Sequence, residues 1–252
     1  MRFRSGLLLS SFLILSMSPA FAADPAYVQA GVVVRAADAD AAKSGIPGIA
    51  SHVPDLEKAL ADGAADFPPK PSGNGQMVML TDGPAEALMA MMTAANQKQG
   101  SVAIQNPYPE AGLLLAVYYN EVGKPDDVLR IVNITLQREP VAGMNIGAHM
   151  PALFQEQGVA FAALKRWEES LAAGDAELKA ANSDKDKSRA QRLRGYALIE
   201  LKRLDDAQAA YTESLKLEPS NPTALNEMTY INKLRAGTNQ PAGVASGDKP
   251  AL

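Results

Sequence analysis

The sequence contains no cysteine and only two histidines, which excludes several kinds of site at once. Disulfides, zinc–thiolate and iron–sulfur centres, cysteine nucleophiles and the acylated cysteine of a lipoprotein are all ruled out. His52 and His149 stand almost a hundred residues apart and belong to no metal-binding motif. We therefore expect no metal, no cofactor and a fold stabilised by packing.

Runs of positive charge are also missing. The formal charge is −4 over 252 residues, and no segment is strongly basic, which argues against binding to nucleic acid or to anionic lipid. The H-E-x-x-H signature of metalloproteases and the G-x-S-x-G elbow of hydrolases do not occur. We therefore predict a protein that is not an enzyme.

The one apolar run that resembles a targeting segment lies at the N-terminus. Two arginines within the first four residues precede the apolar residues 6–18, and Ala20 and Ala22 occupy the two recognition positions of a cleavage site. The run is shorter than the ~20 residues that cross a bilayer. We expect a secretory signal peptide at residues 1–22, cleaved after Ala22, and an exported bacterial protein that is periplasmic or secreted, without stable membrane insertion.

A helical hairpin is the clearest internal pattern. Apolar residues follow helical spacing over residues 190–201, and a second helix is expected over 204–217, before Pro219. The polar pair at 202–203 forms the turn between them. The sequence therefore predicts two short antiparallel helices within residues 188–221.

Four residues of this hairpin stand at the spacing of a known repeat. Gly195, Ala207, Tyr211 and Pro219 occupy positions 8, 20, 24 and 32 of a 34-residue unit, and the segment resembles the tetratricopeptide repeat (TPR). The glycine lies where the two helices cross, with the alanine and tyrosine as its small and large contacts. The resemblance implies an α-solenoid whose concave groove holds a segment of a partner protein.

Two looser copies precede this repeat, and a cap follows it. We expect repeats at about residues 109–142 and 151–184, a capping helix at 222–235 and a disordered tail at 236–252. The fold class is therefore mostly α, a solenoid of helical hairpins over 109–235.

The region at residues 23–108 gives a weaker pattern. Residues 27–35 are compatible with a strand because they include three consecutive valines, and 54–64 with a short helix. Residues 66–75 resemble a linker. Over 76–105, a short βαβ unit and two helices with an extended lead-in are alternatives. We expect a small mixed or helical N-terminal region.

Five methionines cluster within this region, at residues 77–92. Thioethers are ligands for Cu(I), whereas methionine is also a common core residue. Met89 and Met92 share a helix face, and Met77 and Met79 alternate as in a strand. We interpret the cluster as core packing.

The resemblance also implies which residues line the groove. The face formed by the first helix of each hairpin is expected to contact the partner. On this face the candidate binding residues are Asn120, Gln155, Arg189, Arg192, Tyr196, Ile199, Asn226 and Tyr230. The basic clamp that binds acidic peptide termini in some members of the family has Leu113 and Val117 in place of its Lys and Asn, which argues against that ligand.

Two functions are compatible with these observations. The first is a non-catalytic protein-interaction scaffold or adaptor of the bacterial cell envelope, which binds a protein or peptide partner in the groove. The alternative is an enzyme or small-molecule binder with its site in residues 23–108 and the repeats as a targeting arm. We favour the first because the sequence contains no recognisable catalytic set.

Overall fold

A computed structural model describes residues 25–65, 76–81, 83–97, 100–137 and 148–237. The expected signal peptide, the linker and most of the C-terminal tail lie outside these residues. The chain divides into two compact units, with the boundary between Leu114 and Leu115. Within the described ranges, none of the helices combines the length and the apolar content that a membrane span requires.

Unit 1 begins with three packed helical segments, α1 (Pro25–Ser44), the 3-10 helix η1 (Ile46–His52) and α2 (Val53–Ala65). The expectation of a strand at residues 27–35 is wrong, because the whole segment belongs to α1. Its buried side chains recur at helical rather than alternating spacing: Tyr27, Ala30, Val34, Ala37 and Ala41. Tertiary packing of this alanine-rich face therefore outweighs the strand propensity of the valines.

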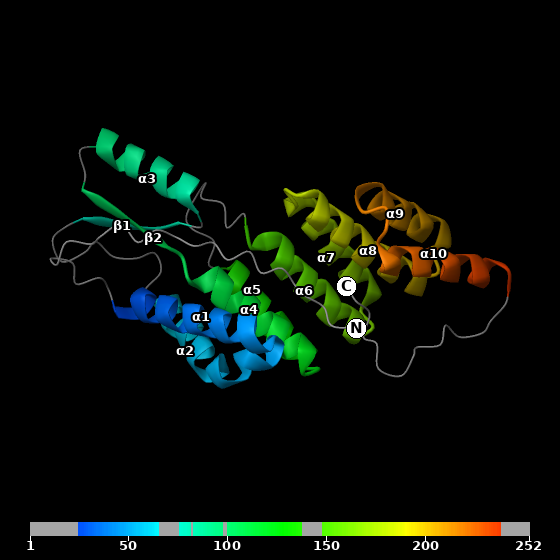
Figure 1. The fold of residues 1–252 in the computed structure, drawn as a ribbon, viewed down its shortest axis with the longest axis horizontal. Coiled ribbons are helices and arrows are strands. Elements are labelled where there is room, and N and C mark those ends of the chain that lie inside the picture. The colour runs from blue at the N-terminus through cyan, green and yellow to red at the C-terminus, as the bar shows by residue number, and fades with distance from the viewer. Residues whose placement is uncertain (1–24, 66–75, 82, 98–99, 138–147, 238–252) are drawn as a thin grey trace. The chain divides into compact units, whose positions relative to one another are not determined.

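A small βαβ element follows in unit 1. Strands β1 (Met77–Thr81) and β2 (Ser101–Gln105) are parallel and pair from Met77 with Ser101 to Thr81 with Gln105. Helix α3 (Pro84–Asn96) connects them and packs against both strands (Figure 1). The segment adopts the first of the two alternatives considered for residues 76–105.

The methionines of α3 do not form a core. Met79 is buried with Ala90 and Ala94 between strand and helix, but Met89, Met91 and Met92 are 70%, 50% and 58% exposed. The interpretation of the cluster as core packing is therefore wrong for these three residues. The small alanines face the strands, because a helix over a two-stranded sheet buries one narrow stripe.

Seven helices form the rest of the described chain. They are α4 (Tyr108–Glu121), α5 (Pro125–Leu136), α6 (Met150–Ala163), α7 (Trp167–Ala180), α8 (Asp184–Glu200), α9 (Leu204–Leu217) and α10 (Pro222–Arg235). The unit boundary falls within α4. From α5 to α10 each helix packs against the next, α6 packs against α8, and α8 against α10 (Figure 1). This nearest-neighbour packing is the arrangement of a helical solenoid.

The same tight turn joins the two helices of each hairpin. Gly123, Lys165 and Lys202 all have positive φ, between 58° and 71°, and each lies two residues after the last residue of a helix. The next residue donates its backbone N–H to a carbonyl five residues earlier, as in Arg166 to Phe161 and Arg203 to Leu198, both at 2.9 Å. These bonds satisfy carbonyls left free at the helix end. All three hairpins therefore share one turn conformation, even where their sequences match the repeat pattern only loosely.

Helix α8 begins at Asp184, six residues before residue 190, where its apolar pattern begins. The Ser183 side chain accepts a hydrogen bond from the backbone N–H of Asp186 at 3.1 Å and caps the helix. Serine with an acidic residue three positions later is a typical helix start. The added residues include Asp186, which lies on the same helix face as Arg189.

Candidate partner-binding face

The first helices of the hairpins and the capping helix, here called the A helices, are α4, α6, α8 and α10. Successive members α6, α8 and α10 lie side by side. All eight candidate residues lie on A helices, but they differ in exposure. Asn226 is exposed; Asn120, Arg189, Tyr196 and Tyr230 are partly buried; Gln155, Arg192 and Ile199 are buried.

Ile199 and Gln155 contribute to packing and not to an open surface. Ile199 is 2% exposed and belongs to the core cluster that contains Ala207 and Tyr211 of α9. Gln155 is 4% exposed. The spacing of residues along a helix predicts the face on which a residue lies. Whether its side chain reaches solvent depends on how much of that face is covered by the neighbouring helices. Neither side chain is therefore available to a partner in this structure.

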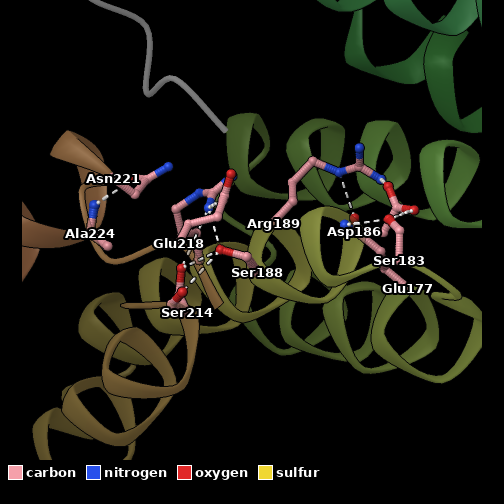
Figure 2. A network of polar contacts seen from close by, with 10 residues as sticks. Glu177, Ser183, Asp186, Ser188, Arg189, Ser214, Glu218, Asn221 and Ala224 are labelled. Atoms are coloured by element: carbon pink, nitrogen blue, oxygen red, sulfur yellow. Dashed lines mark hydrogen bonds and ion pairs between the residues drawn. The ribbon is translucent and has the colours of Figure 1, made fainter. Parts of the chain in front are cut away.

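Arg189 is bound to acidic residues of the same unit. Its Nε donates to Oε1 of Glu177 at 2.6 Å, and its Nη2 lies 3.1 Å from Oδ1 of Asp186 (Figure 2). The Glu177 side chain, on α7, is fully buried. Burial raises the pKa of Glu177 to about 7, while the charge and hydrogen bond of Arg189 lower it and the charges of Asp186 and Glu156 raise it.

Arg192 is bound in a second network that joins α8 to the end of α9. Its Nη1 donates to Oγ of Ser188 at 2.8 Å and to Oε2 of Glu218 at 2.5 Å. The hydroxyls of Ser188 and Ser214 lie 2.9 Å apart, and both residues are fully buried (Figure 2). Burial acts to raise the pKa of Glu218, but the hydrogen bonds of Ser188 and Arg192 lower it overall. Arg192 therefore links α8 to the end of α9 within one hairpin.

Because of this network, we expect Arg192→Ala to lower the unfolding free energy by about 1 kcal/mol, a small value because Glu218 is partly exposed. Denaturant unfolding followed by the fluorescence of Trp167, the single tryptophan of the chain, measures it. Arg203→Ala is the control, since Arg203 pairs with Asp206 where both side chains are half exposed. Equal stability of the two variants would contradict the structural role of Arg192.

Asn120 connects the first hairpin to the second. Its Nδ2 donates to the backbone carbonyl of Glu156 at 3.0 Å and to its Oε2 at 2.7 Å. Burial raises the pKa of Glu156, against the hydrogen bond of Asn120 and the charge of Arg189. The sequence placed Asn120, Arg189 and Arg192 on the correct helices, but it did not reveal that Glu156, Glu177 and Glu218 are their partners.

Aromatic residues line the C-terminal part of the A-helix face. The rings of Tyr196 and Trp167 meet edge to face, with centroids 6.0 Å apart. Both residues remain partly exposed, as does Tyr230 of α10. Beneath them, the ring of Tyr211 fills the space above Gly195, where an added Cβ would lie 2.6 Å from Cε2. This close crossing is the contact expected from the repeat spacing.

A known repeat family matches the hairpin formed by α8 and α9. Residues 188–221 match the family model described as tetratricopeptide repeat. The chain therefore contains a TPR. It is also similar to the first TPR domain of the human RPAP3 protein (24% identity, 51% of this chain and 95% of the other, TM-score 0.44). A TPR-like protein from Chlorobium tepidum matches at 17% identity over 52% of this chain and 93% of the other, with a TM-score of 0.41.

Outside the TPR, the residues considered for metal binding do not converge. Nε2 of His52 lies 2.9 Å from Oδ2 of Asp40, and this hydrogen bond lowers the pKa of the Asp40 carboxyl. Among the described residues, no three His, Asp or Glu side chains form a group that would hold a metal ion. His149 directly precedes α6 as its N-terminal flanking residue.

Proposed function

We propose that this TPR protein is a non-catalytic interaction scaffold or adaptor of the bacterial cell envelope, which binds a segment of a partner protein on its A-helix face. The observation that carries the proposal is the side-by-side packing of α6, α8 and α10. Val159, Tyr196 and Tyr230 are partly exposed along these three helices. A row of apolar and aromatic side chains on rigid helices suits the recognition of a peptide or helix.

The charged residues of the A-helix face also limit which partner segments can bind. Arg189 and Arg192, the two cations expected to contact it, are bound to Glu177 and Glu218. An acidic partner segment would have to break these pairs, which is costly because Glu177 is fully buried. The face therefore favours partners that are apolar, aromatic or basic.

A matched pair of double variants tests the proposal. In Val159→Ser with Tyr196→Ser, both changes lie on A helices; in Ala172→Ser with Ala209→Ser, both lie at exposed positions of α7 and α9. Proteins captured from envelope extract by the mature chain are identified by mass spectrometry. We expect the A-helix variant to capture about tenfold less of the partner, as for the loss of an aromatic anchor, and the other variant to retain it.

The capture experiment has two outcomes that contradict the proposal. One is a partner that both variants retain equally, and the other is the absence of any specific partner. Circular dichroism of each variant must show unchanged helix content, so that lost capture reports the surface and not unfolding.

Export is a separate part of the proposal. It is supported by the two early arginines, the apolar run at residues 6–18 and the small residues Ala20 and Ala22. We expect the protein from the bacterial periplasm or medium to begin at Ala23, as determined by mass spectrometry of its N-terminal peptide. Recovery of the full-length chain from the cytoplasm alone would exclude this localisation.

A further inference from the structure

Two A helices bring acidic and aromatic side chains together at the C-terminal end of the unit. Tyr196 and Glu200 are four residues apart on α8, and Glu227 and Tyr230 are three apart on α10. The two helices pack against each other. All four side chains are partly exposed, and we call these four residues the α8–α10 cluster.

The carboxylates of this cluster lack a counter-charge. Neither Glu200 nor Glu227 has a hydrogen-bond or ion-pair partner among the described residues. Burial raises the pKa of Glu227, and the charge of Glu200 raises it further, while no cation acts on it. Two partly buried carboxylates near each other without a cation are unfavourable in the free protein.

The hydroxyl of a largely buried tyrosine lies beside the same four residues. Tyr211 of α9 is 1% exposed, and in the described part of the chain its hydroxyl has no hydrogen-bond partner. Burial raises its pKa well above the ordinary value, and the groups that act on it next are Glu227 and Tyr196. The hydroxyl oxygen is not among the buried unpaired polar atoms of the described residues, so it reaches the surface beside the cluster and is free to accept a hydrogen bond there.

The neighbouring cation, Arg192, does not pair with the α8–α10 cluster. Arg192 is the cation that acts on the Tyr211 hydroxyl, and its guanidinium is bound to Ser188 and Glu218. The α8–α10 cluster therefore keeps two unpaired carboxylates and two partly exposed tyrosine rings, and the Tyr211 hydroxyl beside it can accept a hydrogen bond. Carboxylates with aromatic faces are the groups that bind ammonium and guanidinium ions.

We propose that the α8–α10 cluster binds a lysine or arginine side chain of the partner segment. This inference rests on the proposed function, because the cation is carried by the segment that lies on the A-helix face. The ammonium or guanidinium group would neutralise Glu200 and Glu227, lie against Tyr196 or Tyr230 and donate a hydrogen bond to Tyr211. The cluster would thereby fix the position of the segment along the solenoid.

The test is a selection of random peptides of about ten residues, displayed on phage, against the full chain. Selections against Glu200→Gln with Glu227→Gln, and against Glu168→Gln with Glu213→Gln on exposed positions of α7 and α9, run in parallel. We expect the wild-type chain and the α7/α9 variant to enrich lysine or arginine at one peptide position. The cluster variant should lose this enrichment.

The affinity of one selected peptide is then measured for each variant. Fluorescence anisotropy should show its binding weakened about tenfold by the cluster variant and less than about twofold by the control. Replacing its basic residue with methionine should weaken binding to the wild-type chain and not to the cluster variant. Selected peptides without basic enrichment, or enrichment that survives in the cluster variant, would overturn the inference and leave the proposed function standing. Failure to select any peptide would overturn both.

Discussion

Gly195→Val is expected to lower the unfolding free energy by about 3 kcal/mol, because no space exists for a side chain at this helix crossing. A Cβ at this position would lie 2.6 to 2.8 Å from three atoms of the Tyr211 ring. The ring is rigid and 1% exposed, so it cannot turn aside. Helix α8 would have to move away from α9, which also separates the core residues Ala197 and Ala207.

Denaturant unfolding followed by Trp167 fluorescence measures this effect, because Trp167 begins α7 in the same unit. Ala209→Val is the matched control: it adds a β-branched side chain at an exposed position of α9 and should cost less than about 0.5 kcal/mol. If the cost comes from the ring, Gly195→Val combined with Tyr211→Leu should cost less than the sum of the single changes. Additive costs would show that the Tyr211 contact is not the cause.

The residues that could be predicted from the sequence are those whose role is local or set by repeat spacing. Gly195 meets Tyr211 as the 34-residue register requires, and the turn at residues 202–203 is formed by a positive-φ lysine. The start of α8 at Asp184 could also be predicted from the sequence, since the spacing of Ser183 and Asp186 is a capping signal. Apolar periodicity alone placed this start too late.

The residues that could not be predicted are those whose role depends on a partner distant in sequence. Arg189 lies twelve residues from Glu177, and Arg192 lies twenty-six from Glu218. A helical pattern gives the face of each arginine but not the carboxylate that reaches it from the neighbouring helix. For the same reason, the acidic and aromatic character of the cluster on α8 and α10 becomes apparent only when the two helices are placed together.

The stability of the helical unit is expected to fall by about 3 kcal/mol as the pH rises from 4.5 to 7. Burial raises the pKa of Glu177 from 4.5 to about 7, and one pKa unit corresponds to about 1.4 kcal/mol. The folded state therefore binds a proton more tightly than the unfolded state in this range. This contribution of Glu177 is fully present below pH 4.5 and is lost as the pH rises through its folded pKa of about 7.

The groups around Glu177 determine how large this effect is. Arg189 favours its ionised form, whereas the carboxylates of Asp186 and Glu156 oppose it. The pKa of Glu156 is itself raised by burial, so its titration changes stability in the same direction. Glu218 has a lowered pKa, and its contribution is lost only at lower pH, as it becomes protonated.

Glu177→Gln separates the contribution of this residue from the others. Glutamine resembles the protonated carboxyl at every pH, so the variant should lose most of the decline between pH 4.5 and 7 and should exceed the wild-type stability at pH 8. Glu168→Gln, at an exposed position of the same helix, should keep the wild-type pH profile. The measurement is denaturant unfolding at several pH values, followed by Trp167 fluorescence. An unchanged slope in Glu177→Gln would mean that the Arg189 ion pair keeps Glu177 ionised despite its burial, because the attraction then exceeds the cost of desolvation.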